Sequence, residues 1–215
     1  MPKLAANLTL MFNEVDFLDR FAAAAKAGFK GVEFLFPYDY DKNVLKQKLD
    51  ENKLTLVLHN MPPGNWNNGE RGIGCHSDRV AEFQAGVEKA IEYANALGCT
   101  QLNCLAGIKP AHRDPLDARE TFIKNLQYAA PRLKAAGIKL LIEAINTRDI
   151  PGFFLNHSAQ AFDIIKAVGS GNLFFQYDIY HMQIMEGDLA PTIEDRKSTR
   201  LNSSHSQQSR MPSSA

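Results

Sequence analysis

Two segments, IKLLIEAIN at residues 138–146 and NLFFQYDIYH at residues 172–181, indicate the fold class of this chain. Both segments are apolar almost throughout, as strands of a parallel sheet are when helices cover the sheet. Residues 158–168, which lie between them, carry apolar side chains at helical spacing. This order of elements predicts two neighbouring parallel strands joined by a crossover helix.

The same alternation extends over residues 1–195. Earlier strands are predicted at residues 4–12, 31–37, 54–62 and 100–107. Helices are predicted from an N-cap at Asn13 to Gly28, at residues 42–52, 77–97 and 117–136, and again from near Pro191. Strict alternation indicates an α/β protein, either a doubly wound sheet or a (β/α)8 barrel. No GxGxxG or GxxxxGK[ST] sequence opens a helix, which removes the commonest reason to prefer a nucleotide-binding open sheet.

Composition narrows the class of protein. The 24 basic residues balance 24 acidic ones, which gives no support to nucleic-acid binding. No apolar run reaches the roughly 18–20 residues of a membrane span, and the N-terminus lacks a signal-peptide cleavage site. The three cysteines lack paired spacing, which argues against a disulfide framework or a structural zinc site. We therefore expect a soluble cytoplasmic protein without a nucleic-acid or membrane partner, and the sequence leaves its oligomeric state open.

Residues 196–215 differ from the rest of the chain. They contain seven serines, four basic residues and no acidic residue, with Leu201 and Met211 as the sizeable apolar groups. Such a segment buries too little apolar surface to offset the entropy of ordering it. The sequence therefore predicts an α/β domain over residues 1–195 and a disordered serine-rich tail over residues 196–215.

Two carboxylates interrupt the apolar strands near their carboxyl ends, where the active sites of such folds lie. Glu143 lies in LLIEAIN and Asp178 in FQYDIYH, and each is costly to bury as an isolated charge. Because the two strands are consecutive and parallel, we expect the side chains to lie a few ångströms apart. Such a pair needs a proton or a cation between its members. The pattern therefore predicts a divalent-metal site or an acid/base pair.

Histidines at two predicted strand ends are further candidates. His59 and His181 can each polarise or protonate a substrate oxygen, or serve as hydrogen-bonded structural residues. Glu33 ranks below them, because its early position in its strand leaves open that it faces a helix instead. The polar loop at residues 62–76, which contains Trp66 and Glu70, is long enough to act as a lid or to be plain surface.

Longer motifs resemble a known family. They are NLTLMF, FLDRFAAAAKAGFKGVEFLFPYDY, LVLHNMPPGNWNNGERGIGC, LIEAIN and QYDIYHMQIMEGDLAPTIED, and the similarity covers essentially all of residues 1–195. The chain is similar to the hydroxypyruvate isomerase family of the xylose isomerase-like (β/α)8 TIM barrels. The resemblance implies that hydroxypyruvate, a small-molecule substrate, is interconverted with 2-hydroxy-3-oxopropanoate (tartronate semialdehyde) through an enediol.

The resemblance also implies roles for individual residues. Glu143 matches the family's acid/base glutamate, which also lies at the metal position of related barrels, and Asp178 matches a divalent-metal ligand. His59 and His181 match histidines that line the substrate pocket. The implied cofactor is a divalent ion, Mg²⁺ or Mn²⁺.

The family continues with strands seven and eight, which carry a glutamine metal ligand and a second catalytic glutamate, where this chain has its serine-rich tail. We therefore expect an incomplete barrel of about six β/α units, poorly soluble or oligomeric, without isomerase activity of its own. Two alternatives remain at this point. One is a related sugar-acid isomerase or epimerase on the same barrel, and the other is a catalytically dead interaction protein produced as a splice variant.

Overall fold

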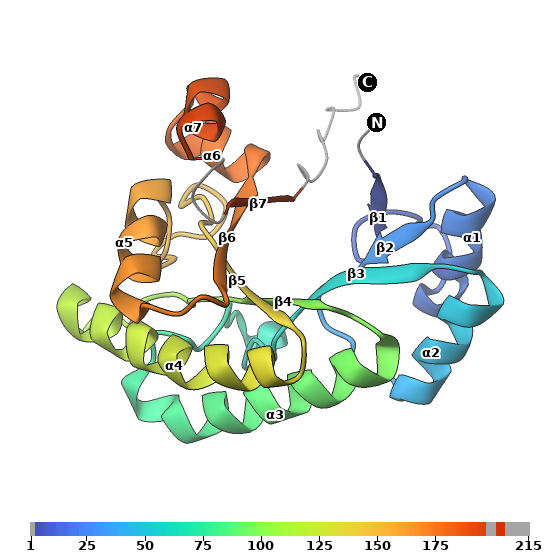
Figure 1. The fold of residues 1–215 in the computed structure, drawn as a ribbon, viewed down its shortest axis with the longest axis horizontal. Coiled ribbons are helices and arrows are strands. Elements are labelled where there is room, and N and C mark those ends of the chain that lie inside the picture. The colour runs from blue at the N-terminus through green and yellow to red at the C-terminus, as the bar shows by residue number, and fades with distance from the viewer. Residues whose placement is uncertain (1–2, 197–200, 205–215) are drawn as a thin grey trace.

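Seven parallel strands form one curved sheet, in the order β1-β2-β3-β4-β5-β6-β7 along the chain and across the sheet (Figure 1). The computed structural model describes residues 3–196 and 201–204. The strands are β1 Ala5–Asn7, β2 Gly31–Glu33, β3 Thr55–Asn60, β4 Gln101–Cys104, β5 Lys139–Glu143, β6 Leu173–Asp178 and β7 Leu201–Ser204. The helices are α1 Arg20–Lys26, α2 Lys42–Glu51, α3 Val80–Leu97, α4 Pro115–Ala135, α5 Ser158–Val168, α6 Ile179–Met185 and α7 Leu189–Arg196.

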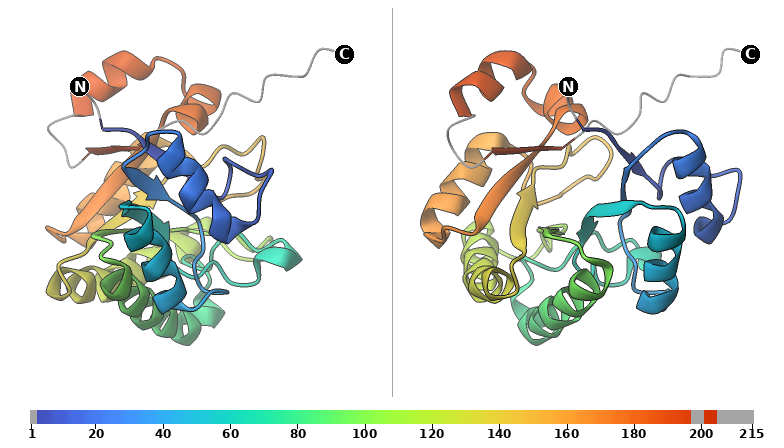
Figure 2. Two further views of the ribbon diagram at one scale, coloured as in Figure 1. Left: turned by 90° about the vertical axis from the view of Figure 1, so that its right-hand side faces the viewer. Right: turned by 45° about the vertical axis from the view of Figure 1, so that its right-hand side comes forward.

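The helices α1 to α5 lie along the outer side of the arc of strands, and the inner side faces the axis of an incomplete barrel (Figures 1 and 2). Within the described residues, β1 and β7 are the two ends of the sheet and do not pair with each other. This arrangement confirms the six predicted strands and the incomplete (β/α)8 barrel. In each β/α unit the helix returns the chain to the edge of the sheet at which the next strand begins. The carboxyl ends of all strands therefore lie at the opposite edge.

Local signals set the helix bounds. Asp114 caps α4 by accepting a hydrogen bond from the backbone N–H of Leu116 at 2.7 Å, and Pro115 occupies the first turn, where its missing N–H costs nothing. Helix α5 ends at Gly169, whose φ of 69° is a left-handed conformation that glycine adopts without steric cost. The predicted span of α5 is confirmed residue for residue.

The main core lies between the outer face of the sheet and the helices. Leu140, Ile142 and Phe175 project outward from β5 and β6 and are fully buried, and the ring of Phe175 packs against Phe162 of α5. Burying each such side chain contributes about 1.5–3 kcal/mol before entropy is subtracted. None of the helices among the described residues is both long and apolar enough to span a membrane.

Several boundaries differ from the sequence prediction: β1 and β2 are shorter than the predicted strands at residues 4–12 and 31–37, and the first helix and the end of β6 are also displaced. The first helix begins at Arg20, after the short 3-10 turn Phe17–Asp19, because Asn13 donates its side-chain amide to the Leu10 carbonyl instead of capping a helix. The chain also turns from strand to helix at Asp178, which caps α6 by accepting from the N–H of His181. His181 therefore lies in the first turn of α6 and not at a strand end.

The predicted tail also contains regular structure. Leu201–Ser204 pair in parallel with β6, in register from Phe175↔Leu201 to Asp178↔Ser204, and α7 extends to Arg196. The expectation of a disordered tail over residues 196–215 stays a prediction, since residues 197–200 and 205–215 lie outside the described ranges. The pairing of Leu201–Ser204 is possible because a strand edge offers backbone N–H and C=O groups, which any extended segment can pair whatever its side chains.

Candidate active site

Polar side chains collect on the inner face of the sheet, near the carboxyl ends of the strands. Phe175 faces α5, so the next residue, Gln176, faces inward, and so does its partner in register on β5, Glu143. The register of the other strands places further polar residues on the same face. This inner polar face consists of Asn7, Glu33, Asn60, Asn103, Glu143, Gln176 and Asp178.

Glu143 and Asp178 form a buried carboxyl pair on the neighbouring strands β5 and β6. Glu143 is 8% exposed and Asp178 is 3% exposed. Asn103 donates its side-chain N–H to Oε2 of Glu143 at 2.9 Å. Burial, and then the charge of Asp178, raise the pKa of Glu143 well above its usual value, and burial also raises the pKa of Asp178. Without a cation between them, burial and mutual repulsion favour a proton on one of the two carboxyl groups.

His181 completes a group of three possible ligands. One ligand atom each from Glu143, Asp178 and His181 lies within 4.8 Å of the others. The Nδ1 atom of His181 lies 2.8 Å from the side-chain nitrogen of Asn146. Burial lowers the pKa of His181, so its ring is neutral at pH 7 and above. The structure thus brings together three of the four residues that the sequence singled out.

His59 lies on the other side of the sheet, which corrects its predicted place in a substrate pocket. It is in register with Leu102, which alternates with the inward-facing Asn103, so the His59 ring projects toward the helices. There it lies against Tyr38, whose ring packs on Tyr93 of α3. Complete burial lowers the pKa of His59 to about 4, so the ring is neutral and part of the core.

Glu33, for which the sequence left a position facing a helix open, lies on the inner polar face. It accepts a hydrogen bond from the side chain of Asn7 at 2.9 Å, and its charge contributes to the raised pKa of Glu143. Sequence reasoning did not single out the amide side chains of this face, which are Asn7, Asn60, Asn103 and Gln176. A signal was present, since a polar residue occurs near the carboxyl end of each of these strands.

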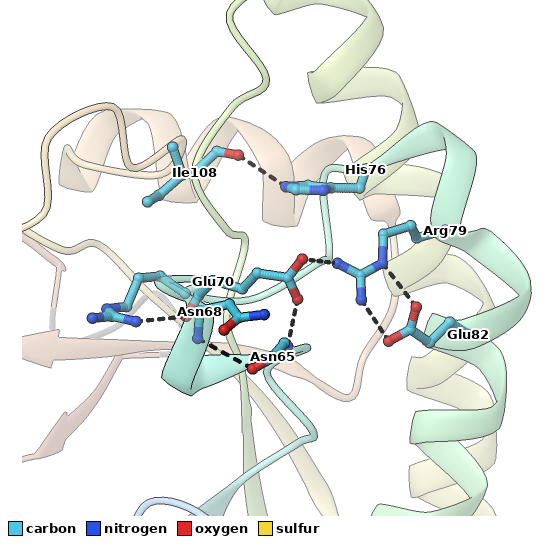
Figure 3. Close-up of polar contacts among 8 residues, drawn as sticks. Asn65, Asn68, Glu70, His76, Arg79, Glu82 and Ile108 are labelled. Carbon is cyan, nitrogen blue, oxygen red and sulfur yellow. Dashed lines mark hydrogen bonds and ion pairs between the residues drawn. The ribbon is translucent and has the colours of Figure 1, made fainter.

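Polar contacts hold the loop between β3 and α3 in place (Figure 3). Glu70 forms an ion pair with Arg79 at 2.5 Å and accepts from the backbone N–H of Asn65, while Arg79 also pairs with Glu82 of α3. At the far end of the loop, Nε2 of His76 lies 2.8 Å from the carbonyl oxygen of Ile108. These contacts hold the loop to α3 and to the segment that follows β4.

At the tip of the loop, the Trp66 ring packs at a tilt against Phe36, which follows β2. The rings of Trp66 and Phe36 lie 4.8 Å apart, and the guanidinium of Arg71 lies 4.1 Å from the centre of the Trp66 ring. Gly72 forms an antiparallel bridge with Ala106, directly beyond β4. The loop therefore contacts the segments that follow β2 and β4, at the carboxyl ends of these strands.

Replacing Glu70 by glutamine is expected to loosen this loop. Because Arg79 lowers the pKa of Glu70, the ion pair is complete at neutral pH and is lost as the pH falls through that lowered pKa. Loss of about 1 kcal/mol corresponds to roughly fivefold faster opening. Hydrogen exchange of the backbone amides of residues 65–69 at pH 7 measures the effect. Glu82→Gln removes the other partner of Arg79 and serves as the control. Equal exchange rates in the two variants would show that the Glu70–Arg79 ion pair does not specifically hold the loop.

Comparison with known proteins assigns the chain to a family. The sequence pattern of the xylose isomerase-like TIM barrel family matches residues 21–211. The chain belongs to this family. Relatives that resemble the chain in sequence are named as isomerases. The chain therefore belongs to an isomerase family with the xylose isomerase-like fold.

Three similar proteins illustrate the relationship. Hydroxypyruvate isomerase of Escherichia coli K12 is 52% identical over 193 residues, which are 90% of this chain and 75% of that protein. The 2-oxo-tetronate isomerase of Cupriavidus necator is 48% identical over 88% of this chain and 73% of its own length. A crystal structure described as an AP endonuclease, family 2, from Brucella melitensis shares 47% identity with a TM-score of 0.91, covering 95% of this chain and 80% of its own.

The inner polar face of this xylose isomerase-like barrel fits a divalent cation by its chemistry. Apart from the carboxyl oxygens of Glu143 and Asp178, it contains two buried amide oxygens without a hydrogen-bond donor, Oδ1 of Asn103 and Oε1 of Gln176. Oxygen atoms with free lone pairs are the ligands that Mg²⁺ and Mn²⁺ prefer. A cation would also relieve the repulsion that raises the pKa of Glu143.

Proposed function

We propose that this chain has the residues of an aldose–ketose type isomerase that interconverts hydroxypyruvate and 2-hydroxy-3-oxopropanoate. The observation that carries the proposal is the buried Glu143–Asp178 pair on the inner face of the sheet, where burial raises the pKa of both carboxyl groups and the charge of Asp178 raises that of Glu143 further. It is supported by the 52% identity to a protein named hydroxypyruvate isomerase. The roles of the site residues and the identity of the substrate both belong to this proposal.

The chemistry requires one proton to leave carbon and another to return. A base removes a proton from C3 of hydroxypyruvate, and the electron pair forms the C2–C3 double bond of an enediolate. A proton then returns to C2, and the hydroxyl proton at C3 passes to the oxygen at C2, which leaves an aldehyde at C3. Glu143 is suited to be the base, since its raised pKa brings its proton affinity closer to that needed near neutral pH.

The surrounding residues would stabilise the negative charge that develops on the oxygens. Asp178 and Glu143 are the residues that would hold a divalent cation, which when bound supplies positive charge beside the enediolate. Asn103 fixes the Glu143 carboxyl group through its hydrogen bond, which limits the motion of the base. The loop with Trp66 and Glu70 would shield the intermediate from water.

A four-carbon substrate is the second candidate, because a protein named 2-oxo-tetronate isomerase is nearly as similar, at 48% identity. Both candidates share a 2-oxo acid and the same proton transfers, and differ by one hydroxymethylene group. An interaction protein without activity finds no support in the comparisons.

The test is an isomerisation assay with both substrates and Mg²⁺. It uses the 215-residue chain and a chimera in which residues 1–195 are followed by the part of the E. coli relative that continues beyond the aligned region. We expect the chimera to convert hydroxypyruvate with a higher kcat/KM than 2-oxo-tetronate, and the 215-residue chain to be inactive. Preference for 2-oxo-tetronate would favour the second candidate. No turnover of either substrate by the chimera would refute the proposal.

A further inference from the structure

The side-chain amide of Asn146 has its orientation set by Asp149. Asn146 is completely buried just after β5. Its Oδ1 accepts from the backbone N–H of Asp149 at 2.8 Å, and its Nδ2 donates to Oδ2 of Asp149 at 3.0 Å. Rotating the amide by 180° would place oxygen against the carboxylate and the NH2 group against the backbone N–H. Both contacts would then be repulsive, so one orientation is selected.

That orientation determines which nitrogen of His181 carries the proton. The same Nδ2 atom of Asn146 lies 2.8 Å from Nδ1 of His181. Since Nδ2 is a donor, Nδ1 must be an acceptor, and in a neutral imidazole the hydrogen is then on Nε2. The hydroxyl of Tyr180, the residue before His181, donates to Oδ2 of Asp149 at 2.7 Å and anchors the far end of this chain of contacts.

We propose that Asn146, held by Asp149 and Tyr180, is a positioning residue that keeps His181 in the Nε2–H form. His181 then presents an N–H donor to an oxygen of the bound 2-oxo acid. The lone pair of Nδ1 is occupied by Asn146 and Nε2 carries a hydrogen, so His181 is not a metal ligand. Only the carboxylates among the three grouped residues have lone pairs free for a cation. The identity of the oxygen rests on the proposed function, whereas the tautomer does not.

The consequence for the reaction concerns the transition state. A donor at the oxygen of C2 or C3 binds the enediolate more tightly than the ketone, because the negative charge is larger there. Loss of the donor is therefore expected to reduce kcat more than it raises KM. The other tautomer would point a lone pair at the same oxygen and repel it.

The test is nitrogen NMR of the 215-residue chain labelled with ¹⁵N-histidine, at pH 8 without metal. The His181 signals are assigned by their absence in His181→Gln. We expect a protonated Nε2 and an unprotonated Nδ1. In Asn146→Asp, an accepting carboxylate replaces the donating amide, and we expect the proton to move to Nδ1. Asn13→Asp, an exposed asparagine near the N-terminus, is the matched control and should leave the His181 spectrum unchanged.

The outcomes separate this inference from the proposed function. A protonated Nδ1 in the unmodified chain would overturn the inference whether or not the Asn146 variant folds. Added Zn²⁺, which favours imidazole ligands, should leave the Nε2–H signal in place, and its loss would overturn the conclusion that His181 is not a ligand. In the active chimera, Asn146→Asp should lower kcat about 10–100-fold with less than about a threefold change in KM. An inactive chimera with the expected tautomer would refute the proposed function alone.

Discussion

Replacing Glu143 by glutamine is expected to lower kcat of the active chimera by about 10²–10⁴-fold, the usual cost of losing one general acid or base. Glutamine keeps the size of the side chain and can still accept the hydrogen bond from Asn103. It cannot take a proton from C3. Exchange of the C3 hydrogen of hydroxypyruvate with solvent deuterium, followed by proton NMR, should fall in parallel with the isomerisation rate.

The control for this substitution is Glu120→Gln, an exposed glutamate on α4 that pairs with Lys124. It should retain full activity. Retention of more than about half the activity in Glu143→Gln would exclude Glu143 as the base, since general acid–base catalysis contributes far more than twofold.

The same substitution has a measurable effect on stability. Burial raises the pKa of Glu143 in the folded chain, so folding binds a proton, and stability is lost as the pH rises from the unfolded pKa toward the raised folded value. Glu143→Gln removes the charge and should flatten this dependence. Melting of the metal-free 215-residue chain at several pH values measures it. A melting temperature for the variant well below that of the unmodified chain above pH 7 would contradict the assignment of a strained buried carboxylate.

Replacing Asp178 by asparagine is expected to weaken divalent-metal binding by at least about 10–100-fold, the range found even for residues that only support a ligand. A neutral amide oxygen is a poorer ligand for Mg²⁺ or Mn²⁺ than a carboxylate. Asparagine is as good a helix cap as aspartate, so α6 and the position of His181 should be retained. Calorimetric titration of the 215-residue chain with Mn²⁺ measures the change in Kd.

Asp163→Asn is the matched control, because Asp163 is exposed on α5, away from the inner polar face. In the chimera, high Mg²⁺ or Mn²⁺ should restore part of the activity lost in Asp178→Asn. Unchanged activity of the unmodified chimera and of the variant in the presence of a chelator would show that the site works without metal.

The elements of the fold were predictable because they depend on local pattern. Continuous apolar runs separated by amphipathic segments predicted the first six of the seven strands, and the span of α5 was predicted to the residue. The proximity of Glu143 and Asp178 followed from the same reasoning, since consecutive strands joined by one helix become neighbours in a parallel sheet. A pair of polar residues on two such strands is therefore readable from sequence.

The inner or outer position of a side chain was not readable from a single strand. A shift in register between β2 and β3, after Val32, pairs Glu33 with Leu58, which places His59 on the opposite face. A shift of one residue exchanges the two faces of a strand, so sequence reasoning left the side of Glu33 open and placed His59 in the substrate pocket. The sheet register decides this, and register depends on neighbours distant in sequence.

The order of strands and helices and the two carboxylates of the candidate site could be read from the sequence, because both depend on where apolar runs begin and end. Tertiary structure alone decided the pairing of Leu201–Ser204 with β6, since backbone hydrogen bonds do not depend on serine-rich composition. It also decided the contact between Asn146 and His181, which lie 35 residues apart. Their meeting requires β5 and β6 to be packed side by side, and the direction of each hydrogen bond is fixed only once Asp149 is in place.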